Sequence, residues 1–422
     1  MFKLPVKLQL KLYKMKNFIL LIVFALAFAN NCKKDPPVPS DFTVTAFDAV
    51  PVAKTNNMQL FAHYMPWFEN KQTSANGNWG WHWTMNNQNP DIVDNEGKRQ
   101  IAAHYYPLIG PYASSDPDLI EYHLLLMKYS GIDGVLIDWY GSTNVYDYGT
   151  NRRNTEALVE KLDKVGLKFA IVYEDATIPQ VMSNTGSGEA VVLARNDMYY
   201  IQQHYFNKSS YIKIGGKPLL LVFGPSYFQA ANDWQLIISA FTDKPVFMPL
   251  WGNSSKLGTT AGGEYMWVDQ VNIDTKYATK DNFTNFIGGA WPGFHDFYKE
   301  GGAGENLFVI EHNNGAVWDN TLAKAQANNM SFLQLITWND FGEGTMIEPT
   351  KEFGYLFLEK LQAFSGVSYQ KSSLEAIEKQ YTLRKSKSSD KSAMKMLDQA
   401  FYYWVSLQNE KAIELIDSVE NR

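Results

Sequence analysis

Residues 332–350 read FLQLITWNDFGEGTMIEPT, and this stretch joins a strand pattern to a cluster of polar residues. Its first six residues form an apolar run typical of a buried strand, and a glycine-containing loop follows. At the junction lie Trp338 and Asn339, which suit the apolar face and the hydroxyls of a sugar, and the carboxylates Asp340 and Glu343. Carboxylate pairs divide acid and base work in most glycosidases. The alternative for this stretch alone is a solvated loop that merely follows a core strand.

Apolar runs of strand length recur along the chain and alternate with helix-like segments. The helical candidates are 118–129, 155–165, 189–205, 230–241, 322–329 and the short 280–287, and the candidate strands are 58–64, 134–139, 169–174, 219–223, 246–251, 266–271, 307–311 and 332–337. Most of the strand candidates are continuously apolar, as in strands buried on both faces. Eight βα units predict a (β/α)8 TIM barrel of the α/β class. An open doubly wound sheet would need a glycine fingerprint after its first strand, and the sequence has none there.

The front of the chain has the pattern of an export signal. Five lysines precede an apolar run over 18–29, which is too short for a membrane span, so residues 1–31 are predicted to be a signal peptide. The only cysteine, Cys32, follows where a bacterial lipoprotein carries its lipid; secretion with a free thiol is the alternative. We expect an outer-membrane or cell-surface lipoprotein, with the periplasm as the other location.

The remaining chain divides by composition into a tether, a barrel and a helical extension. Pro36, Pro37 and Pro39 predict a tether over 32–57, 58–368 form the predicted barrel, and 369–422 form the predicted C-terminal extension. In that extension, 371–385 and 392–419 are expected to be two helices that pack on the outside of the barrel or on a partner.

The net charge of the chain limits the kinds of partner that it can bind. Removing 1–31, with five lysines and no acidic residue, changes the formal net charge from −6 to −11. An acidic chain without a basic run argues against nucleic acid and against electrostatic adhesion to anionic lipid. A single cysteine allows no internal disulfide. We therefore expect a monomer that meets a membrane only through its lipid.

Acids, imidazoles and indoles recur where the predicted strands end. In a (β/α)8 barrel the active site lies at the C-terminal ends of the strands, so these residues are expected to share one site. The connection 65–117 adds Trp79, Trp81, His82 and Trp83, either as a sugar platform or as a loop packed on its own aromatics. The strand-end residues are His63, Tyr64, Trp67, Asp138, Trp139, Tyr140, Tyr173, Glu174, Asp175, Trp251, Asp269, Asn272, Glu311, His312, Asn313, Asp340 and Glu343.

Other chemistries find less support in the sequence. His63, His82 and His312 lack the close ligand spacing of a zinc motif such as HExxH. No GxSxG nucleophile elbow occurs, and no nucleotide-binding fingerprint suggests a cofactor. The sequence therefore predicts carboxylate chemistry without a metal or a cofactor.

Residues 61–349 resemble glycoside hydrolase families 71 and 99. The front half resembles the family 99 endo-α-mannosidases and endo-α-mannanases in HYMPWFE at 63–69, HW at 82–83, GPYASSDPDLIEYHLLLMKYSGIDGVLIDWYG at 110–141 and FAIVYED at 169–175. The catalytic stretch departs from the family 99 pattern Asn-Glu-x-x-Glu-Gly-Thr, because NDFGEGT at 339–345 has Asp in place of the first Glu. In that detail it resembles the family 71 α-1,3-glucanases.

The resemblance implies roles for individual residues. Glu343 takes the position of the general acid and Asp340 that of the base. The base would deprotonate the sugar 2-hydroxyl with retention, as in family 99, or activate water with inversion, as in family 71; the shorter Asp340 leaves more room for water and favours the second route. Glu174 matches an acid that contacts the sugar in the cleaving subsite. The other expected substrate contacts are Tyr64, Trp67, His82, Trp83, Asp138, Tyr140, His312, Trp338 and Asn339.

The sequence therefore predicts an endo-acting glycoside hydrolase that cleaves α-mannan or a related α-glycan. Because Asp340 replaces the usual Glu, a catalytically silent surface glycan-binding protein on the same barrel is the alternative. A hydrolase of esters or amides would need a nucleophile that the sequence does not show.

Overall fold

The computed structural model describes residues 42–186 and 188–422. The predicted signal peptide and Cys32 lie outside the described residues. Within the described part of the chain, no helix has the length and apolar character needed to cross a membrane.

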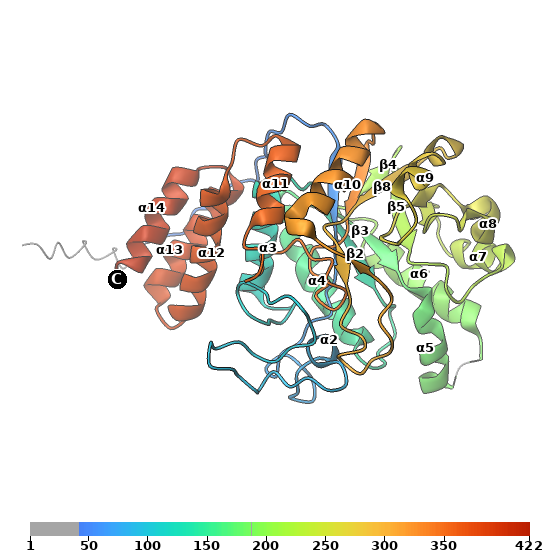
Figure 1. Ribbon diagram of the computed structural model, residues 1–422, viewed down its shortest axis with the longest axis horizontal. Helices are drawn as coiled ribbons and strands as arrows, with labels where there is room; N and C mark the ends of the chain where they lie inside the picture. Colours follow the sequence, from blue (N-terminus) through green and yellow to red (C-terminus); the bar gives the residue numbers. More distant parts are fainter. Residues whose placement is uncertain (1–41, 187) are drawn as a thin grey trace, which may run out of the picture.

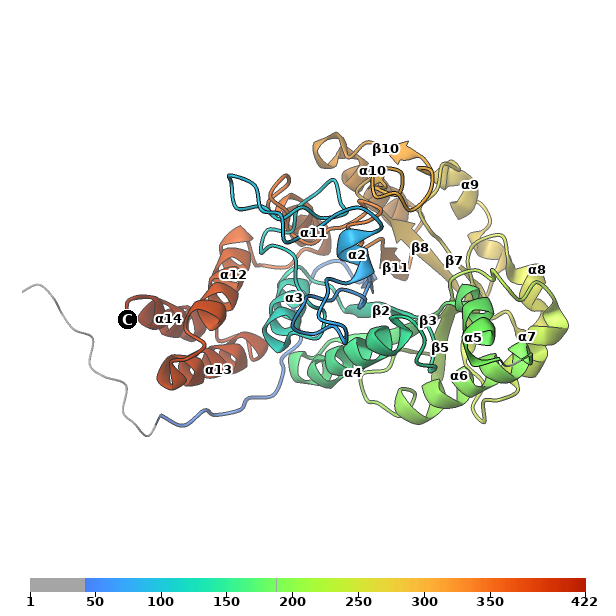
Figure 2. The ribbon, with the colours of Figure 1, turned by 90° about the horizontal axis from the view of Figure 1, so that it is seen from below.

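Eight parallel strands form a closed barrel (Figures 1 and 2). Hydrogen-bonded ladders join them in the order β6-β5-β3-β2-β1-β11-β8-β7. The circle closes through parallel bridges from Phe247 to Ala261 and from Leu250 to Tyr265. The (β/α)8 prediction is confirmed. The strands are β1 (Gln59–Tyr64), β2 (Gly134–Trp139), β3 (Lys168–Tyr173), β5 (Lys217–Val222), β6 (Val246–Pro249), β7 (Glu264–Tyr265), β8 (Phe286–Ala290) and β11 (Phe332–Leu335).

Helices between the strands cover the outside of the barrel (Figure 2). The main ones are α3 (Pro117–Tyr129), α4 (Tyr148–Val165), α5 (Ile178–Thr185), α6 (Ala190–His204), α7 (Ala231–Ile238), α10 (Ala316–Ala327) and α11 (Leu356–Ser365). Shorter elements are α2 (Trp81–Thr84), α8 (Ser254–Leu257), α9 (Ile273–Tyr277), the 3-10 turns Asp175–Thr177, Gly258–Thr260, Lys280–Asn282 and Asn313–Gly315, and the small strands β4 (Lys213–Ile214), β9 (Phe294–His295) and β10 (Val309–Ile310).

Helix α3 shows how local sequence and packing agree. Pro117 occupies the first helical turn, where its missing N–H costs nothing, and the Asp116 side chain accepts a hydrogen bond from the Asp118 N–H at 3.0 Å. From Leu119 to Tyr129 every residue of the helix is buried. A helix apolar nearly all round must be covered on two sides, and α3 lies between the barrel and a C-terminal helix.

The seventh barrel strand is β8, and the prediction of a strand at 307–311 is wrong. Segment 280–287, expected to be a short helix, instead contains a 3-10 turn and the start of β8. Gly288 and Gly289 weaken the strand pattern in the sequence, but the barrel requires them. A Cβ on Gly289 would lie 3.0 Å from Met266 Cβ, and one on Gly288 would lie 2.9 Å from the Tyr277 hydroxyl. The residues at 309–310 pair antiparallel with β9 in a surface hairpin, where Val309 is exposed.

The sixth strand is shorter and earlier than predicted. It spans β7, followed by one further ladder bond from the Met266 N–H to the Ile287 carbonyl at 3.0 Å. Residues 268–271 follow as a loop before α9, so the sequence pattern placed this strand too far along the chain.

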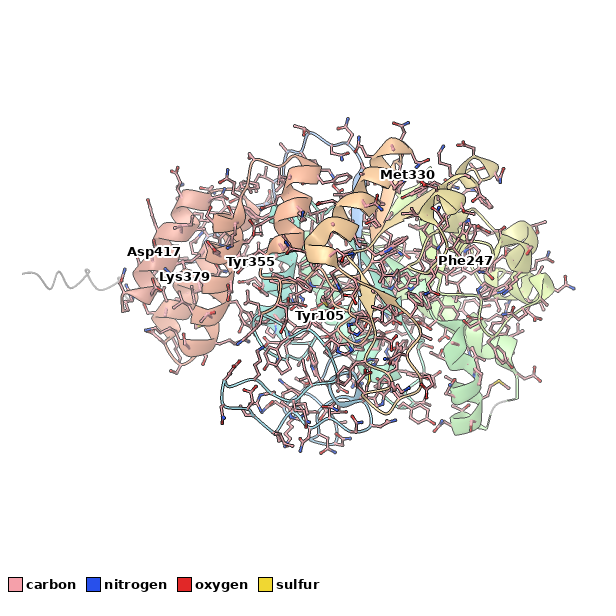
Figure 3. All side chains as sticks on the ribbon, in the orientation of Figure 1. Tyr105, Phe247, Met330, Tyr355, Lys379 and Asp417 are labelled. Carbon is pink, nitrogen blue, oxygen red and sulfur yellow. The ribbon has the colours of Figure 1, made fainter. Side chains whose placement is uncertain are left out.

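Three helices form the C-terminal extension, namely α12 (Lys371–Ser386), α13 (Lys391–Val405) and α14 (Asn409–Glu420). The predicted helix over 392–419 is divided, because Leu407 adopts a left-handed φ of 60° between α13 and α14. Helix α12 packs on α3, and Lys379 of α12 lies beside Asp417 of α14 with an ion pair of 2.9 Å (Figure 3). The extension is therefore joined to the outside of the barrel, as expected.

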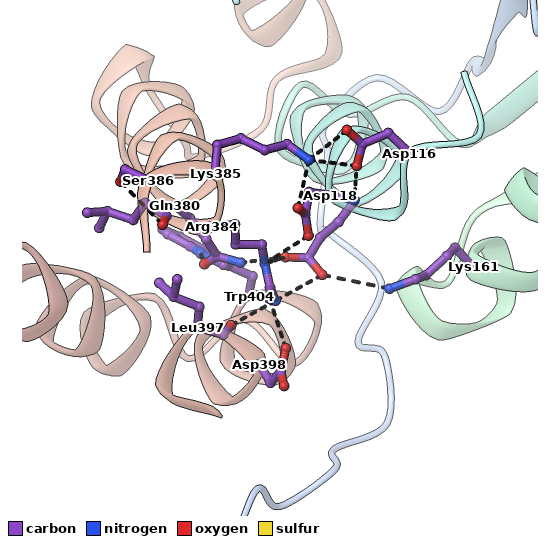
Figure 4. Close-up of polar contacts among 12 residues, drawn as sticks. Asp116, Asp118, Lys161, Gln380, Arg384, Lys385, Ser386, Leu397, Asp398 and Trp404 are labelled. Atoms are coloured by element: carbon purple, nitrogen blue, oxygen red, sulfur yellow. Dashed lines mark hydrogen bonds and ion pairs between the residues drawn. The ribbon is translucent and has the colours of Figure 1, made fainter. Parts of the chain in front are cut away.

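A buried ion pair anchors α12 on α3. Arg384 Nε donates to Glu121 at 2.7 Å, and each side chain is 5% exposed. Arg384 also pairs with Asp398 of α13 at 2.8 Å, and Lys385 contacts Asp116 and Asp118; Figure 4 draws these contacts as dashed lines. Burial raises the pKa of Glu121, and the nearby Arg384 opposes that shift.

The described part of the predicted tether, 42–57, lies against the C-terminal helices. The Val50 N–H donates to the Val405 carbonyl at 2.9 Å, and the Thr45 N–H donates to Gln399 Oε1 at 2.6 Å. Lys128 Nζ of α3 donates to the Val50 carbonyl at 2.7 Å. From Thr45 onward this segment is held in place by α3 and α13.

Candidate active site

A cavity of about 220 Å³ lies at the C-terminal ends of the barrel strands. It collects side chains that follow β1, β2, β3, β5, β7, β8 and β11, so one site draws on most of the barrel. This is the location where the fold places active sites. The lining residues are His63, Met65, Trp67, Trp81, His82, Met85, Asp138, Tyr140, Glu174, Phe223, Trp267, Tyr298, Asp340, Gly342 and Glu343.

The turn that carries Asp340 and Glu343 is held by hydrogen bonds on both sides. The Glu343 N–H donates to Asp340 Oδ1 at 2.9 Å, and the Asp340 N–H donates to Thr337 Oγ1 at 2.8 Å. From the loop after β8, the His295 N–H donates to the Glu343 carbonyl at 2.8 Å, and the Phe297 N–H donates to the Gly342 carbonyl at 2.9 Å. Both carboxyl groups line the cavity, so they converge on one space.

The surroundings of Asp340 and Glu343 raise the pKa values of the two carboxyls by different amounts. Burial and the nearby Asp340 raise the pKa of Glu343 well above its usual range, while a 3.0 Å hydrogen bond from the Tyr298 hydroxyl opposes that shift. Burial raises the pKa of Asp340 only to about 6, because the backbone amides of Gly342 and Glu343 stabilise its anion. Near neutral pH the turn therefore offers a protonated Glu343 beside an ionised Asp340.

A second pair of carboxyls lines the same cavity. Asp138 lies near the end of β2 and Glu174 directly follows β3, and both line the cavity. Burial raises the pKa of both groups, that of Glu174 to about 7. Both were expected from the sequence to contact substrate.

Aromatic rings form one wall of the cavity. Trp67 stacks on His82 with centroids 4.0 Å apart and an interplanar angle of 4°, and Tyr140 lies 6.1 Å from Trp67. Beyond Tyr140 a groove of about 490 Å³ continues past Tyr146 and Tyr148. Stacked rings of this kind suit the apolar face of a sugar, so the predicted contacts Trp67, His82 and Tyr140 lie where a glycan would meet them.

The segment NWGWHW at 78–83 was predicted to be either a sugar platform or a loop packed on its own aromatics, and it contributes to both. Trp81 and His82 line the cavity. Trp83 is fully buried, packs on Phe68 with centroids 4.1 Å apart, and donates from Nε1 to the Tyr112 carbonyl at 2.7 Å. The prediction that Trp83 contacts substrate is corrected, because its ring fills the core of the loop.

Tyr64, Trp338 and Asn339 also lie behind the cavity, contrary to prediction. Asn339 is fully buried and bonds the backbone N–H and carbonyl of Met65 at 2.8 and 3.0 Å. The Tyr64 hydroxyl contacts His123 Nδ1 at 3.1 Å, and Trp338 packs edge-on against the same ring. These residues join the end of β1 to the turn after β11, so they position the site from behind.

His312 supports the catalytic turn from the side instead of lining the cavity as predicted. Its Nε2 lies 2.9 Å from the Gly344 carbonyl, and its Nδ1 lies 3.1 Å from the hydroxyl of Tyr105, which Figure 3 labels. Because the residues before it belong to a hairpin and not to a barrel strand, the segment 311–313 does not end at the site.

Several lining residues were not among the predicted site residues. Tyr298 and Trp267 follow β8 and β7, the two strands that the sequence misplaced, so their loops were not recognised. His63 was named only as a strand-end residue; it is fully buried, burial lowers its pKa to about 3, and its Nε2 has no partner among the described residues. Phe223, Met65 and Met85 complete the lining. Correct strand ends would have identified Tyr298, whereas ordinary apolar residues give no such signal.

Across 42–186 and 188–422, no three His, Cys, Asp or Glu side chains are grouped so that they could hold a metal ion.

Comparison with known proteins agrees with the front half of the sequence pattern. The family model "Glycosyl hydrolase family 99" matches residues 55–252. The chain is 22% identical over 333 residues to "Glycoprotein endo-alpha-1,2-mannosidase" of Mus musculus, covering 72% of this chain and 71% of that protein. It is 23% identical over 290 residues to "Glycoprotein endo-alpha-1,2-mannosidase-like protein" of Danio rerio, covering 61% and 63%.

Solved structures show the same fold. The GH99 endo-alpha-mannosidase from Bacteroides thetaiotaomicron matches with a TM-score of 0.55 at 20% identity, covering 76% of this chain and 99% of that one. A "Glycoside hydrolase-like protein" matches with a TM-score of 0.52 at 14% identity, covering 78% and 98%. The predicted resemblance to family 99 is confirmed, while the turn at 338–345 lies beyond the region that the family model matches.

Proposed function

We propose that this chain, which is a family 99-like glycoside hydrolase, is an endo-acting enzyme that cleaves α-mannan or a related α-linked glycan. One observation carries the proposal: Glu343 and Asp340 line the same cavity, where burial and the nearby Asp340 raise the pKa of Glu343 well above its usual range. Similarity to the Mus musculus endo-alpha-1,2-mannosidase and to the Danio rerio endo-alpha-1,2-mannosidase-like protein supports the choice of an α-mannoside.

In the proposed reaction Glu343 is the general acid and protonates the departing glycosidic oxygen. Asp340 is the base, and its shorter side chain favours activation of a water molecule over removal of a proton from the sugar 2-hydroxyl. Glu174 accepts a hydrogen bond from a sugar hydroxyl, and the Trp67–His82 wall holds the ring. Positioned acid–base help of this kind is worth about 10²- to 10⁴-fold in rate.

The first test replaces the acid. Glu343→Gln should lower kcat/KM by about 10²-fold or more, because an amide cannot protonate the leaving oxygen. Glu305→Gln is the matched control, since Glu305 is exposed and pairs with Lys299 at the surface. Near-normal turnover by Glu343→Gln would contradict the assignment.

The second test identifies substrate and stereochemistry together. Wild-type protein is incubated with fragments of α-mannan and α-glucan, and proton NMR follows the anomer first released. Cleavage of an α-mannan fragment inside the chain is expected, with inversion if Asp340 activates water and retention if it acts on the 2-hydroxyl. Calorimetric binding of these glycans without any cleavage would contradict the catalytic proposal and favour a glycan-binding protein.

The proposal extends to location: the chain is exported and carries a lipid on Cys32, as an outer-membrane or cell-surface lipoprotein. It rests on the lysine-rich start, the apolar run over 18–29 and the cysteine that follows. In a Gram-negative host, the wild-type protein should enter the detergent phase of a phase-separation assay, and Cys32→Ser should stay in the aqueous phase. Equal partitioning of the two would contradict lipidation.

A further inference from the structure

Asp138 and Glu174 lie at the C-terminal ends of neighbouring barrel strands, two residues apart in register. Strands β2 and β3 pair in parallel with Asp138 opposite Val172 and Trp139 opposite Tyr173. The Glu174 N–H donates to the Trp139 carbonyl at 3.0 Å, which extends the ladder by one residue. Their side chains meet in a hydrogen-bonding contact and both line the cavity.

We propose that Asp138 carries a proton during turnover and donates it in a hydrogen bond to the Glu174 carboxylate, so that Asp138 is the positioning residue for Glu174. The inference rests on the proposed function, in which Glu174 binds a sugar hydroxyl.

Burial and charge around Asp138 favour its neutral form. Asp138 is 1% exposed, and its Oδ2 accepts no hydrogen bond from any residue that the structure describes. Among the described residues, no lysine or arginine lines the cavity. An unpaired buried carboxylate would therefore lack any compensation for the water that it loses. The titratable groups that face Asp138 are the carboxyls of Glu174, Asp340 and Asp147 and the hydroxyls of Tyr140 and Tyr265.

The difference in burial gives the direction of the hydrogen bond, because Asp138 is 1% exposed whereas Glu174 is only partly buried. Burial and the charge of Glu174 raise the pKa of Asp138 well above its usual range, and Asp340 and Asp147 act in the same direction. Burial also raises the pKa of Glu174, to about 7, but its contact with Asp138 opposes that shift. Two adjacent buried carboxyls repel each other when both are ionised, which costs free energy. They therefore share one proton, and it resides on the more buried Asp138.

This arrangement has two consequences for glycan binding. The neutral Asp138 holds the Glu174 carboxylate toward the cavity without adding a charge of its own. When the shared proton leaves at alkaline pH, two adjacent anions repel each other, Glu174 turns away, and binding of a neutral glycan weakens. The loss at alkaline pH therefore belongs to the pair and is separate from the titration of Glu343.

Infrared difference spectra of the ligand-free protein test the protonation directly. At pH 7 the wild type should show the carbonyl stretch of one protonated carboxyl that Asp138→Asn lacks, since every other carboxyl cancels in the difference. The stretch should disappear as the pH is raised. A spectrum in which Asp138→Asn removes only an ionised-carboxylate signal would overturn the inference, whatever the enzyme cleaves.

Binding and kinetics test the positioning. In a Glu343→Gln background, where the general acid no longer titrates, calorimetry follows the affinity for α-1,2-linked mannotetraose from pH 5 to pH 9. The protein with Asp138 should lose affinity at alkaline pH, whereas the additional Asp138→Asn change should abolish that transition because the amide keeps its donor. Asp197→Asn is the control; it removes a buried carboxyl that bonds Ser142 and Tyr173 outside the cavity and should leave the transition in place.

The conservative variant separates positioning from simple filling of space. In the Glu343-intact enzyme, Asp138→Asn should retain at least about tenfold more kcat/KM than Asp138→Leu, because only the amide donates to Glu174 and a hydrogen bond to a charged group is worth about one to two powers of ten. Equal losses in the two variants, or an alkaline transition that survives Asp138→Asn, would overturn the inference. If the infrared signal is present but no glycan is cleaved, the proposed function fails while the proton-sharing pair stands.

Discussion

The hydroxyl of Tyr298 offers a sharp test of how the site tunes its acid. It donates to Glu343 Oε1 at 3.0 Å and thereby lowers the pKa of Glu343, against the larger effects of burial and Asp340. Tyr298→Phe removes the donor and leaves the ring, so the ionised form of Glu343 loses its hydrogen bond. A hydrogen bond to a charged group contributes about 1.5 to 3 kcal/mol, and one pKa unit corresponds to about 1.4 kcal/mol. The pKa of Glu343 should therefore rise by about 1 to 2 units.

The sign of the effect follows from the role of Glu343. The acid must be protonated, so activity is lost as the pH rises through its pKa, and a higher pKa moves that alkaline limb to higher pH. The profile of kcat/KM against pH reports the groups of the free enzyme. It is best measured with Asp138→Asn present in both proteins, so that the Asp138–Glu174 pair no longer titrates. The acid limb, set by Asp340, should move much less.

Tyr105→Phe is the matched control. Its hydroxyl bonds His312 Nδ1 at 3.1 Å, close to the same turn, and touches neither catalytic carboxyl. The control should leave the alkaline limb in place. An alkaline limb that stays fixed in Tyr298→Phe, or that moves to lower pH, would refute the assignment of this limb to Glu343.

Three further predictions concern stability. His63 has a pKa of about 3 in the folded chain against an ordinary value of 6.5, so it remains neutral in the folded chain while the unfolded chain takes up a proton. Its contribution to the free energy of unfolding is constant above pH 6.5 and falls by about 1.4 kcal/mol per pH unit from there toward pH 3. The free energy of unfolding of His63→Asn, measured by urea denaturation at several pH values, should therefore depend less steeply on pH than that of the wild type. Parallel pH profiles for the two proteins would contradict this. Arg384→Met leaves Glu121 buried without its partner and should cost about 3 to 5 kcal/mol in urea denaturation, whereas Lys385→Met at the partly exposed neighbouring pair should cost less than about 1 kcal/mol. Gly289→Val should lower the melting temperature through about 1 to 3 kcal/mol of overpacking against Met266, and an unchanged melting temperature would show that the barrel interior has room there.

Local sequence patterns were sufficient to predict a strand or helix where the signal lies in the residues of that segment itself. β2 is an apolar run that contains Asp138 near its end, and the structure buries all six of its residues, so prediction and observation coincide at 134–139. Asp116 and Pro117 start α3 through their own geometry and need no tertiary contact. β8 shows the limit of this approach, because its glycines carry no hydrophobic signal and are required only by neighbours such as Met266 and Tyr277.

For several site residues, the prediction was right or wrong together with the prediction of the strand before them. Correctly predicted strands place Asp340, Glu343, Asp138 and Glu174 at or just beyond their C-terminal ends, and all four line the cavity. Tyr298 was missed together with β8, and His312 was misplaced together with the hairpin that precedes it. Errors in two strand positions therefore account for much of what the predicted site lacked.

The order of apolar runs and breaks determined that this chain forms eight βα units, and the polar residues at strand ends determined where chemistry is concentrated. Both are properties of single segments, because burial on two faces and the end of a parallel strand are visible in a short run of residues. Only the tertiary structure decided which of two adjacent residues faces the cavity. Asp340 lines the cavity, whereas Asn339 is hydrogen-bonded to Met65 behind it. The tertiary structure also decided that Asp138 meets Glu174, since a contact between side chains on different strands depends on the register of the closed barrel.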